Sequence, residues 1–293
     1  MAGGTSLTSP PLTVAVQGEL GSNSELAARE YFDGSEVTIV PCRTFAALFD
    51  AVHSETAEFG MAPVDNSMGG SIHEVWELLV DTPLPIEGEI FLRISHCLIS
   101  HRGTRLTDIR RIYSHPQALA QCREYLSSQQ DVDVEEVYDT AGAVKMIAER
   151  RERDTAAIAS AQAAADYGME ILARDLQVRQ DNFTRFLVLS PKEREHGQKT
   201  LKTTAIAALD DDPHLPDLLT PLTDRHLEIL KSEPHPCPNR PWKHLLYLEF
   251  PGSARDPEIS AALTELQTKT KQLWTLGSYP KGRHAEPHIR IRS

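Results

Sequence analysis

Short apolar runs alternate with amphipathic helical patterns through most of this 293-residue chain, and this alternation limits its fold more than any other feature. The first three apolar runs lie at residues 13–17, 37–40 and 59–64. A capping residue precedes the helical pattern after each run, and for Ser22 and Ser71 a glutamate follows at capping-box spacing; Thr44 is the third cap. Strands that alternate with helices of about ten residues build α/β folds with mainly parallel sheets.

A second set of units follows Pro83 and Pro85, where the composition shifts towards β-branched and large aliphatic residues. Extended chain is predicted over residues 86–99, and Thr140 is the predicted cap of a later helix. Further strands are predicted at residues 134–138, 156–159 and 183–189. The break near residue 85 predicts two lobes with a cleft between them.

The last part of the chain has a different order of elements. A charged stretch from residue 191, containing Gly197, is typical of a linker. Beyond it the patterns read strand, helix, strand, strand, helix and strand, at residues 202–209, 215–225, 227–232, 244–250, 257–271 and 272–279. This order predicts a ferredoxin-like βαββαβ module.

The formal net charge of −12 disfavours nucleic acid and anionic membranes as partners. An anionic substrate would therefore need local positive groups. No apolar run approaches the ~20 residues that span a bilayer, and residues 1–11 lack the basic start and apolar centre of a signal peptide. We therefore predict a cytoplasmic protein.

Cysteines and histidines show no metal-binding pattern in the sequence. There is no CxxC pair and no HExxH motif. The sequence therefore predicts reduced, mostly buried thiols and no metal. The four cysteines are Cys42, Cys97, Cys122 and Cys237.

The segment DNFTRF at residues 181–186 places an amide, a hydroxyl and a fixed cation at the start of a predicted strand. Because side chains alternate along a strand, Thr184 and Phe186 should face one way and Arg185 the other. Three interpretations of Arg185 stay open. It lines the substrate pocket if the start of the strand is irregular, supports the site from behind the residues that contact substrate, or is a solvated residue of an edge strand.

Two polar loops, DNSMGGS at residues 65–71 and DTAGA at residues 139–143, each lie between a strand and a helix. Ligands bind at such positions in open α/β sheets, and glycines there expose backbone amides to anionic oxygens. Each loop alone is also consistent with a plain polar connection, but together they predict two helix N-termini facing one cleft. His115 precedes a proline at a helix start, which favours a helix cap over a catalytic histidine.

These motifs resemble those of prephenate dehydratases, over essentially the whole chain past residue 12. The resemblance rests on five segments in the family's order: QGELGSNS at residues 17–24, PVDNS at 63–67, SHPQALAQC at 114–122, DTAGA at 139–143 and NFTRF at 182–186. It implies an α/β catalytic domain with two lobes, similar to a type II periplasmic binding protein, followed by a ferredoxin-like βαββαβ ACT domain.

The resemblance and the element order together predict the domain boundaries. A flexible tail takes residues 1–12, the catalytic domain 13–190, a linker 191–200, and an ACT-like regulatory or oligomerisation domain 201–293. Lobe 1 of the catalytic domain covers about residues 13–85 and 170–190, and lobe 2 about 86–169.

The resemblance also implies a carbon–oxygen lyase that removes water and carbon dioxide from prephenate without a cofactor, giving phenylpyruvate for phenylalanine biosynthesis. Expelling hydroxide calls for a general acid, which typically contributes ~10²–10⁴-fold. The family's Thr-Arg-Phe motif assigns this role to Thr184, with Arg185 and Asn182 as further catalytic residues. The implied substrate-binding residues are Asn66, Ser67, Gly70, Ser114, Thr140, Ala141, Ala143 and Phe186.

The C-terminal module departs from the pattern of ACT domains that bind phenylalanine in this family. Those domains carry Gly-Ala-Leu and Glu-Ser-Arg-Pro, whereas this chain reads PHL at residues 213–215 and KSEP at residues 231–234. Because the glycine is replaced and the charges are reversed, we predict no ordinary inhibition by phenylalanine and only an oligomerising role, in a homodimer or homotetramer. The candidate effector residues are His214, Leu215, Ser232 and Glu233.

Two other functions stay open. An arogenate dehydratase performs the same elimination on the amino counterpart of the side-chain ketone and would give phenylalanine directly. A non-catalytic amino-acid sensor would keep the two-lobed fold but would not need the hydroxyl and the guanidinium of residues 184 and 185.

Overall fold

A computed structural model describes residues 10–197, 200–210, 214–237 and 242–290. Most of the predicted tail and part of the predicted linker lie outside these residues. The chain forms two compact units: unit 1 comprises Met1–Met61, Leu92–Phe183 and Ala285–Ser293, and unit 2 comprises Ala62–Phe91 and Thr184–His284. The predicted lobes divide the chain differently and stay a prediction. Within the described ranges, no helix has the length and apolar character needed to cross a membrane.

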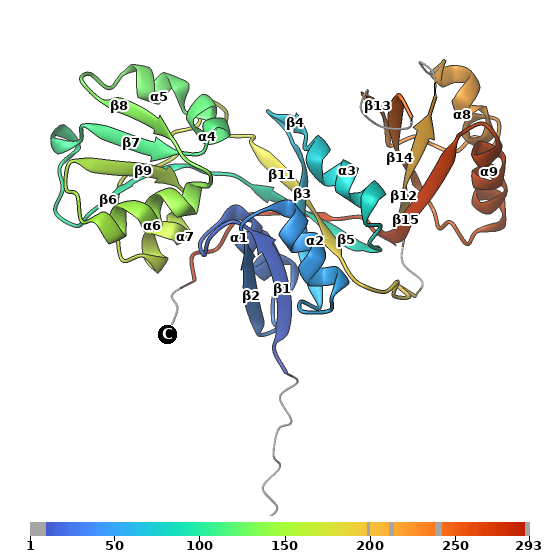
Figure 1. The fold of residues 1–293 in the computed structure, drawn as a ribbon, viewed down its shortest axis with the longest axis horizontal. Coiled ribbons are helices and arrows are strands. Elements are labelled where there is room, and N and C mark those ends of the chain that lie inside the picture. The colour runs from blue at the N-terminus through green and yellow to red at the C-terminus, as the bar shows by residue number, and fades with distance from the viewer. Residues whose placement is uncertain (1–9, 198–199, 211–213, 238–241, 291–293) are drawn as a thin grey trace, which may run out of the picture. The chain divides into compact units, whose positions relative to one another are not determined.

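The N-terminal part of unit 1 contains the first two predicted βα units. Strand β1 (Leu12–Gln17) pairs in parallel with β2 (Val37–Cys42) and with the start of β3 (Phe59–Asn66). Helices α1 (Asn23–Tyr31) and α2 (Phe45–His53) follow β1 and β2 (Figure 1). The side chains of Ser22 and Thr44 accept hydrogen bonds from the amides of Glu25 and Ala47, which confirms both predicted caps.

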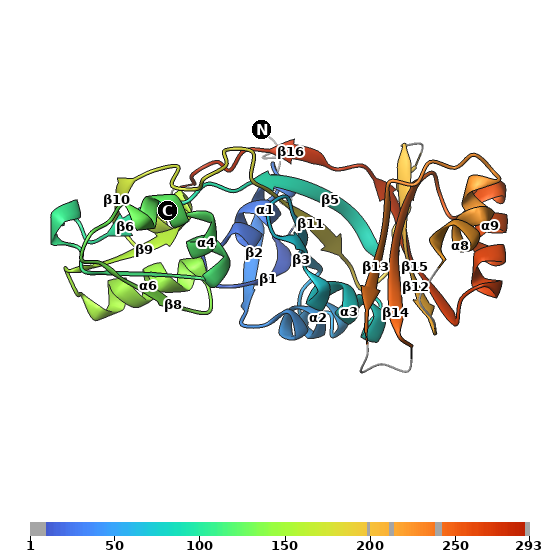
Figure 2. The ribbon, with the colours of Figure 1, turned by 90° about the horizontal axis from the view of Figure 1, so that it is seen from above.

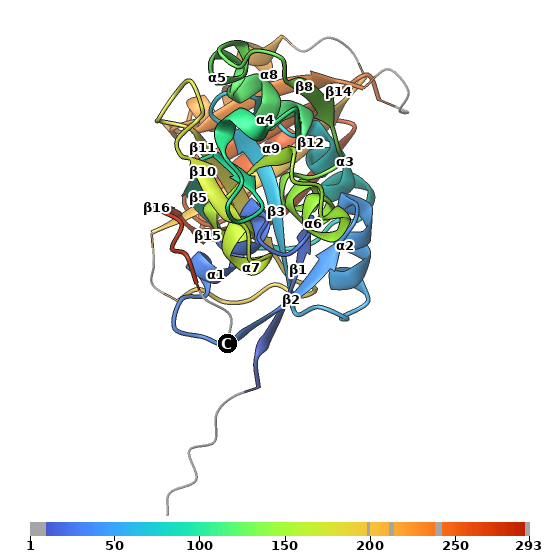
Figure 3. The ribbon, with the colours of Figure 1, turned by 90° about the vertical axis from the view of Figure 1, so that its left-hand side faces the viewer.

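Unit 1 also contains a five-stranded sheet in the order β10-β6-β9-β7-β8. It is mixed, because β7 is parallel to β8 and β9 whereas β6 is antiparallel to β9 and β10. Helices α6 and α7 pack on one face and α4 on the other (Figures 1 and 3). The elements are β6 (Cys97–Ser100), η1 (Leu106–Asp108), β7 (Arg111–Ser114), α4 (Pro116–Gln121), α5 (Arg123–Ser127), β8 (Asp133–Glu136), α6 (Thr140–Arg150), β9 (Thr155–Ala159), α7 (Ala161–Asp166) and β10 (Glu170–Ala173).

Two predicted helix caps are wrong. Helix α3 (His73–Asp81) begins after Ile72 and has no side-chain cap. Ser71 instead belongs to the short strand β4 (Gly70–Ser71), which pairs with the end of β3, and its hydroxyl donates to the Asp65 carboxylate at 2.8 Å. Thr140 is the first residue of α6, and the carboxylate of Asp139 before it is the cap.

In unit 2, strand β11 (Phe183–Leu189) lies between β5 (Ile86–Arg93) and the end of β3, and β16 (Arg283–Ala285) adjoins β5. The C-terminal elements follow in the predicted order: β12 (Leu201–Leu209), α8 (Leu215–Thr223), β13 (Lys231–Pro236), β14 (His244–Pro251), α9 (Pro257–Thr268) and β15 (Gln272–Pro280). They form an antiparallel sheet in the order β13-β14-β12-β15, the arrangement of a ferredoxin-like module. The predicted α/β class and the βαββαβ order are confirmed, although β13 begins four residues later than the predicted strand at 227–232.

The two faces of the C-terminal sheet differ in chemistry. Helices α8 and α9 cover one face through a cluster that includes Leu246, Leu248 and Phe250 (Figure 2). Residues at alternate positions point to the opposite face, where the ring of Tyr247 stacks on Trp76 of α3 with centroids 4.8 Å apart. This second face carries charged side chains and belongs to the surroundings of the candidate site.

Candidate active site

The hydroxyl of Thr184, near the start of β11, is held by a side chain of β3 in unit 2. Nδ2 of Asn66 donates a hydrogen bond of 2.9 Å to Thr184 Oγ1. Thr184 is 8% exposed and Asn66 is 7% exposed, so the contact is largely screened from water. Because the oxygen of Thr184 accepts this bond, its own proton remains available to donate. Asn66 thus orients the Thr184 hydroxyl as a donor.

The loop after Asn66 is shaped by the other end of the same amide. Asn66 Oδ1 accepts hydrogen bonds from the backbone amides of Met68 at 3.0 Å and Gly69 at 2.8 Å. Gly70 has a φ of +76°, which favours glycine, and it pairs with Asn66 across the turn. Ser67 and Gly70, both predicted to bind substrate, lie exposed on this loop. One buried side chain therefore fixes both the loop and the Thr184 hydroxyl.

Arg185 points away from Thr184 into a buried cluster of carboxylates, as the alternation of the strand predicts. Its Nε lies 2.6 Å from Glu89, its Nη1 3.1 Å from Asp65 and its Nη2 2.5 Å from Glu249. Lys202 bonds two of these carboxylates, at 2.7 Å to Glu89 and 3.0 Å to Glu249. Because Arg185 is only 6% exposed, the interpretation as a solvated edge residue is wrong.

Two carboxylates of this cluster, Asp65 and Glu249, remain ionised. Burial raises the pKa of Asp65, but Arg185 and Lys231 outweigh it and hold that pKa below its usual value. Burial likewise raises the pKa of Glu249, and Arg185 and Lys202 bring it below the ordinary range. The Arg185 guanidinium therefore pairs with protein carboxylates on the side of β11 opposite to the Thr184 side chain. Phe186, the next residue facing the Thr184 side, is 1% exposed and part of the core.

Asn182 is fully buried in unit 1 and bonds Gln121, the last residue of α4. Asn182 Nδ2 donates to Gln121 Oε1 at 2.9 Å, and His96 Nε2 lies 2.8 Å from the same oxygen. Burial lowers the pKa of His96, so the imidazole is neutral near pH 7 and its Nε2 hydrogen donates to that oxygen. This chain of polar contacts fixes the orientation of the Asn182 amide.

The N-terminus of α6 in unit 1 is occupied by its own cap. Asp139 Oδ2 accepts from the amides of Gly142 at 2.9 Å and of Glu19 at 3.1 Å. Burial raises the pKa of Asp139, while the amides of Glu19 and Gly142 partly offset this. Ala141 and Ala143 are fully buried, which leaves only their backbone for ligand contacts, whereas Thr140 is partly exposed. The prediction that this loop faces the loop after Asn66 joins residues of different units and stays a prediction.

Two residues of the SHP segment have structural contacts. The hydroxyl of Ser114 is buried and donates to the backbone oxygen of Ile158 at 2.6 Å, which joins β7 to β9. His115 Nδ1 accepts from the amide of Gln117 at 3.2 Å, so the predicted helix cap is confirmed. The predicted role of Ser114 in substrate binding remains untested.

The four candidate effector residues divide into two pairs. His214 Nδ1 lies 3.0 Å from an Asp217 carboxylate oxygen in an exposed contact, and Leu215 packs against the core under α8. On β13, a carboxylate oxygen of Glu233 lies 2.7 Å from Ser71 Oγ, whereas the hydroxyl of Ser232 is buried. The Glu233 side chain is therefore engaged with the loop that carries Ser71.

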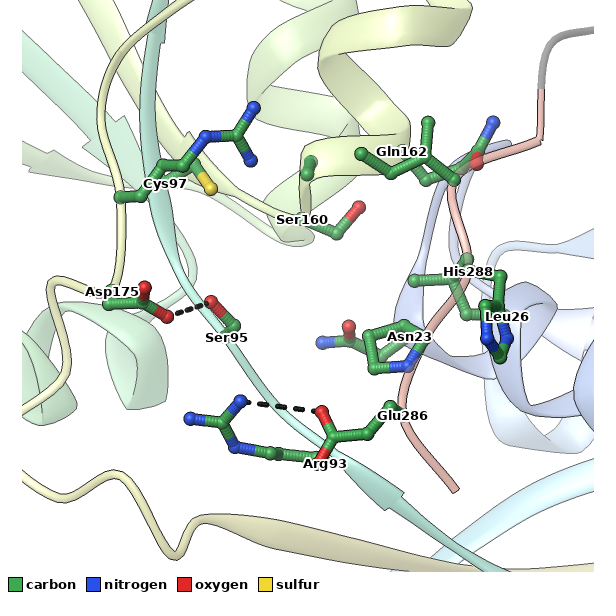
Figure 4. Close-up of a pocket in the computed structure, with 14 residues that line it drawn as sticks. Asn23, Leu26, Arg93, Ser95, Cys97, Ser160, Gln162, Asp175, Glu286 and His288 are labelled. Atoms are coloured by element: carbon green, nitrogen blue, oxygen red, sulfur yellow. Dashed lines mark hydrogen bonds and ion pairs between the residues drawn. The ribbon is translucent and has the colours of Figure 1, made fainter.

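A cavity of about 190 Å³ lies elsewhere in unit 1 (Figure 4). Ser95 and Ser160 line it together with the C-terminal segment at residues 286–289. Figure 4 shows Arg93 paired with Glu286 at 3.3 Å across one side of the cavity. The residues that line it include none of the predicted site residues, so this cavity adds nothing to the candidate site.

Sequence reasoning missed most of the groups that hold the site residues in place. Gln121 lay inside the SHPQALAQC segment, which was a usable signal. The other missed groups have no local motif, because they reach the site from distant parts of the chain. They are His96, Glu89, Lys202 and Glu249.

Comparisons with known proteins agree with these motifs. The family model "Prephenate dehydratase" matches residues 14–194. Arogenate dehydratase 2 of Petunia hybrida is 38% identical over 285 residues, which is 92% of this chain and 72% of that protein.

Two solved structures cover 92% of this chain. The prephenate dehydratase of Arthrobacter aurescens in complex with L-Phe has a TM-score of 0.83 at 26% identity and is covered over 90% of its length. GqqA, a novel type of quorum quenching acylase, has a TM-score of 0.80 at 32% identity and is covered over 98%. Since the family model covers more than half of the chain and a curated relative is similar over most of its length, the chain belongs to the prephenate dehydratase family.

Proposed function

We propose that this chain converts prephenate to phenylpyruvate, carbon dioxide and water. Membership of the prephenate dehydratase family supports this activity. The observation that carries it furthest is the 2.9 Å hydrogen bond from Asn66 to Thr184, because it joins two of the family's motifs into one oriented hydroxyl donor. No redox step is involved, so the elimination requires no electron carrier.

Thr184 is the proposed donor to the departing hydroxyl of prephenate. Loss of the ring carboxylate as carbon dioxide supplies the electron pair that makes the ring aromatic, and the hydroxyl leaves as water after gaining a proton. A threonine hydroxyl is a weak acid in water, so Thr184 acts as a positioned hydrogen-bond donor while the proton comes through a network. Donors aimed at developing negative charge are among the largest contributions to catalysis.

Substrate binding is proposed for the polar groups around this hydroxyl. The exposed loop of Ser67 and Gly70, the partly exposed Thr140 and the backbone at residues 141 and 143 supply donors to the two carboxylates of prephenate. Asn182 and Ser114 complete the proposed set, and Phe186 excludes water. Because Arg185 is paired with three protein carboxylates, we assign it to holding Thr184 in place rather than to contacting substrate.

Arogenate is the second candidate substrate. The arogenate dehydratase of Petunia hybrida is 38% identical to this chain, and its reaction is the same elimination. In the described part of the chain, no contact of the Thr184 site separates a keto from an amino side chain. Only the substrate preference, and not the chemistry at Thr184, distinguishes the two functions.

Product formation by the purified chain tests the proposal. Prephenate and arogenate are supplied separately, and phenylpyruvate and phenylalanine are measured. Phenylpyruvate formed faster from prephenate is the expected result, and turnover of arogenate alone contradicts it. Turnover of neither substrate favours the amino-acid sensor.

The similarity to a quorum quenching acylase adds one further assay, in which an N-acyl substrate is supplied. An acylase nucleophile needs an adjacent base. The Thr184 hydroxyl is instead bonded by the Asn66 amide among the residues that the structure describes. We therefore expect no acyl release, and release in the absence of dehydration contradicts the proposal.

We further propose that the protein acts in the cytoplasm as a homodimer or homotetramer. The ferredoxin-like module supports assembly. Sedimentation of the purified chain measures the oligomeric state, and a monomer at assay concentration contradicts the assembly.

A further inference from the structure

Three side chains of metal-binding types meet between α3 and the end of β13 in unit 2. Glu77 lies on α3, His235 on β13, and Cys237 directly after that strand. One carboxylate oxygen, one ring nitrogen and the sulfur lie within 4.8 Å of one another. The sequence shows no such site, because the helix that carries Glu77 lies far from the strand in the chain.

The separation of these atoms is close to that of a tetrahedral zinc site. Bonds of ~2.0–2.3 Å to zinc place neighbouring ligand atoms roughly 3.3–3.8 Å apart. His235 Nε2 already lies 3.3 Å from Glu77 Oε1. The largest separation, up to 4.8 Å, exceeds the tetrahedral value by roughly 1 Å, which side-chain rotation can close.

The three proposed ligand side chains differ in their exposure to solvent. Cys237 is 5% exposed, whereas Glu77 and His235 are only partly buried. The sulfur side therefore excludes water, and the carboxylate side leaves a route for an ion to enter.

One buried polar atom beside these groups lacks a partner. The ring of Tyr247 lies 6.0 Å from that of His235, and its buried hydroxyl has no hydrogen-bond partner among the described residues.

A second histidine adjoins the cluster. His73 lies one turn before Glu77 on α3, and its ring stacks on that of His235 with centroids 3.8 Å apart. Its Nδ1 is a buried atom with no hydrogen-bond partner in the described ranges. His73 therefore adjoins the cluster but is not one of the three residues whose ligand atoms lie together.

We propose that Glu77, His235 and Cys237 bind one divalent cation of the zinc class. A thiolate and an imidazole select zinc over magnesium or calcium, which prefer oxygen ligands. The bound ion joins α3 to the C-terminal sheet. Its charge balances those of the thiolate and the carboxylate, so the site is neutral overall.

The ion has a structural role in this arrangement. Helix α3 follows the loop of Ser67 and Gly70, and Glu233 on β13 already bonds Ser71 at the end of that loop. A metal two residues beyond Glu233 on the same face of the strand adds a second attachment between the C-terminal sheet and this part of the chain. We assign the ion no part in the proposed elimination.

Cobalt titration of the full chain tests the proposal, after bound metal has been removed with a chelator. We expect one Co²⁺ per chain and a thiolate-to-cobalt charge-transfer band in the near ultraviolet, which Zn²⁺ then abolishes by competition. Zn²⁺ should also raise the melting temperature, because binding to the folded state stabilises it. A wild-type chain that shows no sulfur band overturns the proposal by itself.

Variants identify the ligands. Cys237→Ser should remove the band, and Glu77→Gln and His235→Ala should weaken Co²⁺ binding by more than the ~10–100-fold that loss of an outer-shell partner typically costs. Cys42→Ser is the matched control, because the Cys42 thiol is also buried and also bonds a backbone oxygen two residues earlier. A band that persists in Cys237→Ser, or disappears in Cys42→Ser, assigns the metal to another site and overturns the proposal.

Discussion

The Thr184 hydroxyl accepts from Asn66 and keeps its own proton, and this property can be removed without changing the shape of the side chain. Thr184→Val replaces the hydroxyl by a methyl group, so we expect kcat on prephenate to fall by the ~10²–10³-fold that loss of one positioned hydrogen-bond donor costs. Thr184→Ser keeps the hydroxyl and should retain most of the activity. Steady-state rates of phenylpyruvate formation measure the difference.

The melting temperature serves as the control for this pair, because both variants must remain folded for the rates to be compared. A Thr184→Val enzyme that is folded and as active as the wild type would show that the hydroxyl has no part in the reaction.

The ion pair between Lys231 and Asp65, at 2.9 Å, leads to a prediction about acid stability. Burial raises the pKa of Asp65, but Arg185 and Lys231 lower it overall. A carboxyl whose folded pKa lies below its unfolded value of ~3.9 stabilises the protein above that pH, and the stabilisation is lost as the pH falls through the folded pKa. Lys231→Met should therefore lower the melting temperature at pH 7 by about 2 °C, for a loss of ~1 kcal/mol.

The difference between wild type and Lys231→Met should shrink as the pH is lowered below about 4. Lys269→Met is a suitable comparison, because Lys269 bonds the Asp217 backbone oxygen and the Thr220 hydroxyl and no carboxylate in the described contacts. Its effect should not change over the same range. A Lys231→Met difference that grows on acidification would contradict the assigned direction of the pKa shift.

At the scale of elements, the turn between β1 and α1 depends on Gly21 for two separate reasons. Its φ is +86°, and an added Cβ would lie 2.7 Å from the backbone Cα of Ala163. Gly34 has the same φ with nothing within 4 Å, so Gly34→Ala measures the conformational cost alone, roughly 1–2 kcal/mol. Gly21→Ala should cost a further ~1–3 kcal/mol for the overlap with α7. Denaturant unfolding of both variants tests this, and equal losses would contradict the close approach.

Elements whose start or end is marked by a local signal could be predicted from the sequence. Ser22 and Thr44 each precede an amphipathic pattern, and both cap the predicted helices. Strand β11 also has its predicted bounds. Ser71 carried the same signal but bonds Asp65, a partner brought near by the fold of the hairpin. Local spacing was therefore reliable only where no tertiary partner competed for the capping side chain.

The candidate site was predictable to a similar degree. The alternation of β11 correctly separated Thr184 from Arg185, because that follows from strand geometry alone. The carboxylates around Arg185 were not predictable, since Glu89 and Glu249 come from strands on either side in the chain. The same limit hid the cluster of Glu77, His235 and Cys237, whose members adjoin only after folding.

At the scale of the whole molecule, the contacts that β13 makes with the loop at residues 65–71 bear on regulation by phenylalanine. A similar solved structure, the prephenate dehydratase of Arthrobacter aurescens, is a complex with L-Phe. In this chain the two charged side chains of the KSEP segment contact each other, with Lys231 2.8 Å from Glu233. Both also contact the loop at residues 65–71: Lys231 lies 2.9 Å from Asp65, and Glu233 lies 2.7 Å from Ser71. An amino acid binding there would have to displace these contacts.

We therefore expect L-phenylalanine to leave the rate of the purified chain unchanged at concentrations up to the substrate concentration. A ligand without differential affinity for two states of a protein shifts neither state. The measurement is the initial rate on prephenate against added L-phenylalanine, with D-phenylalanine as the control for non-specific effects. If only the L-enantiomer lowers the rate, the altered PHL and KSEP segments still form an effector site, and Lys231→Met should then change the concentration at which inhibition occurs.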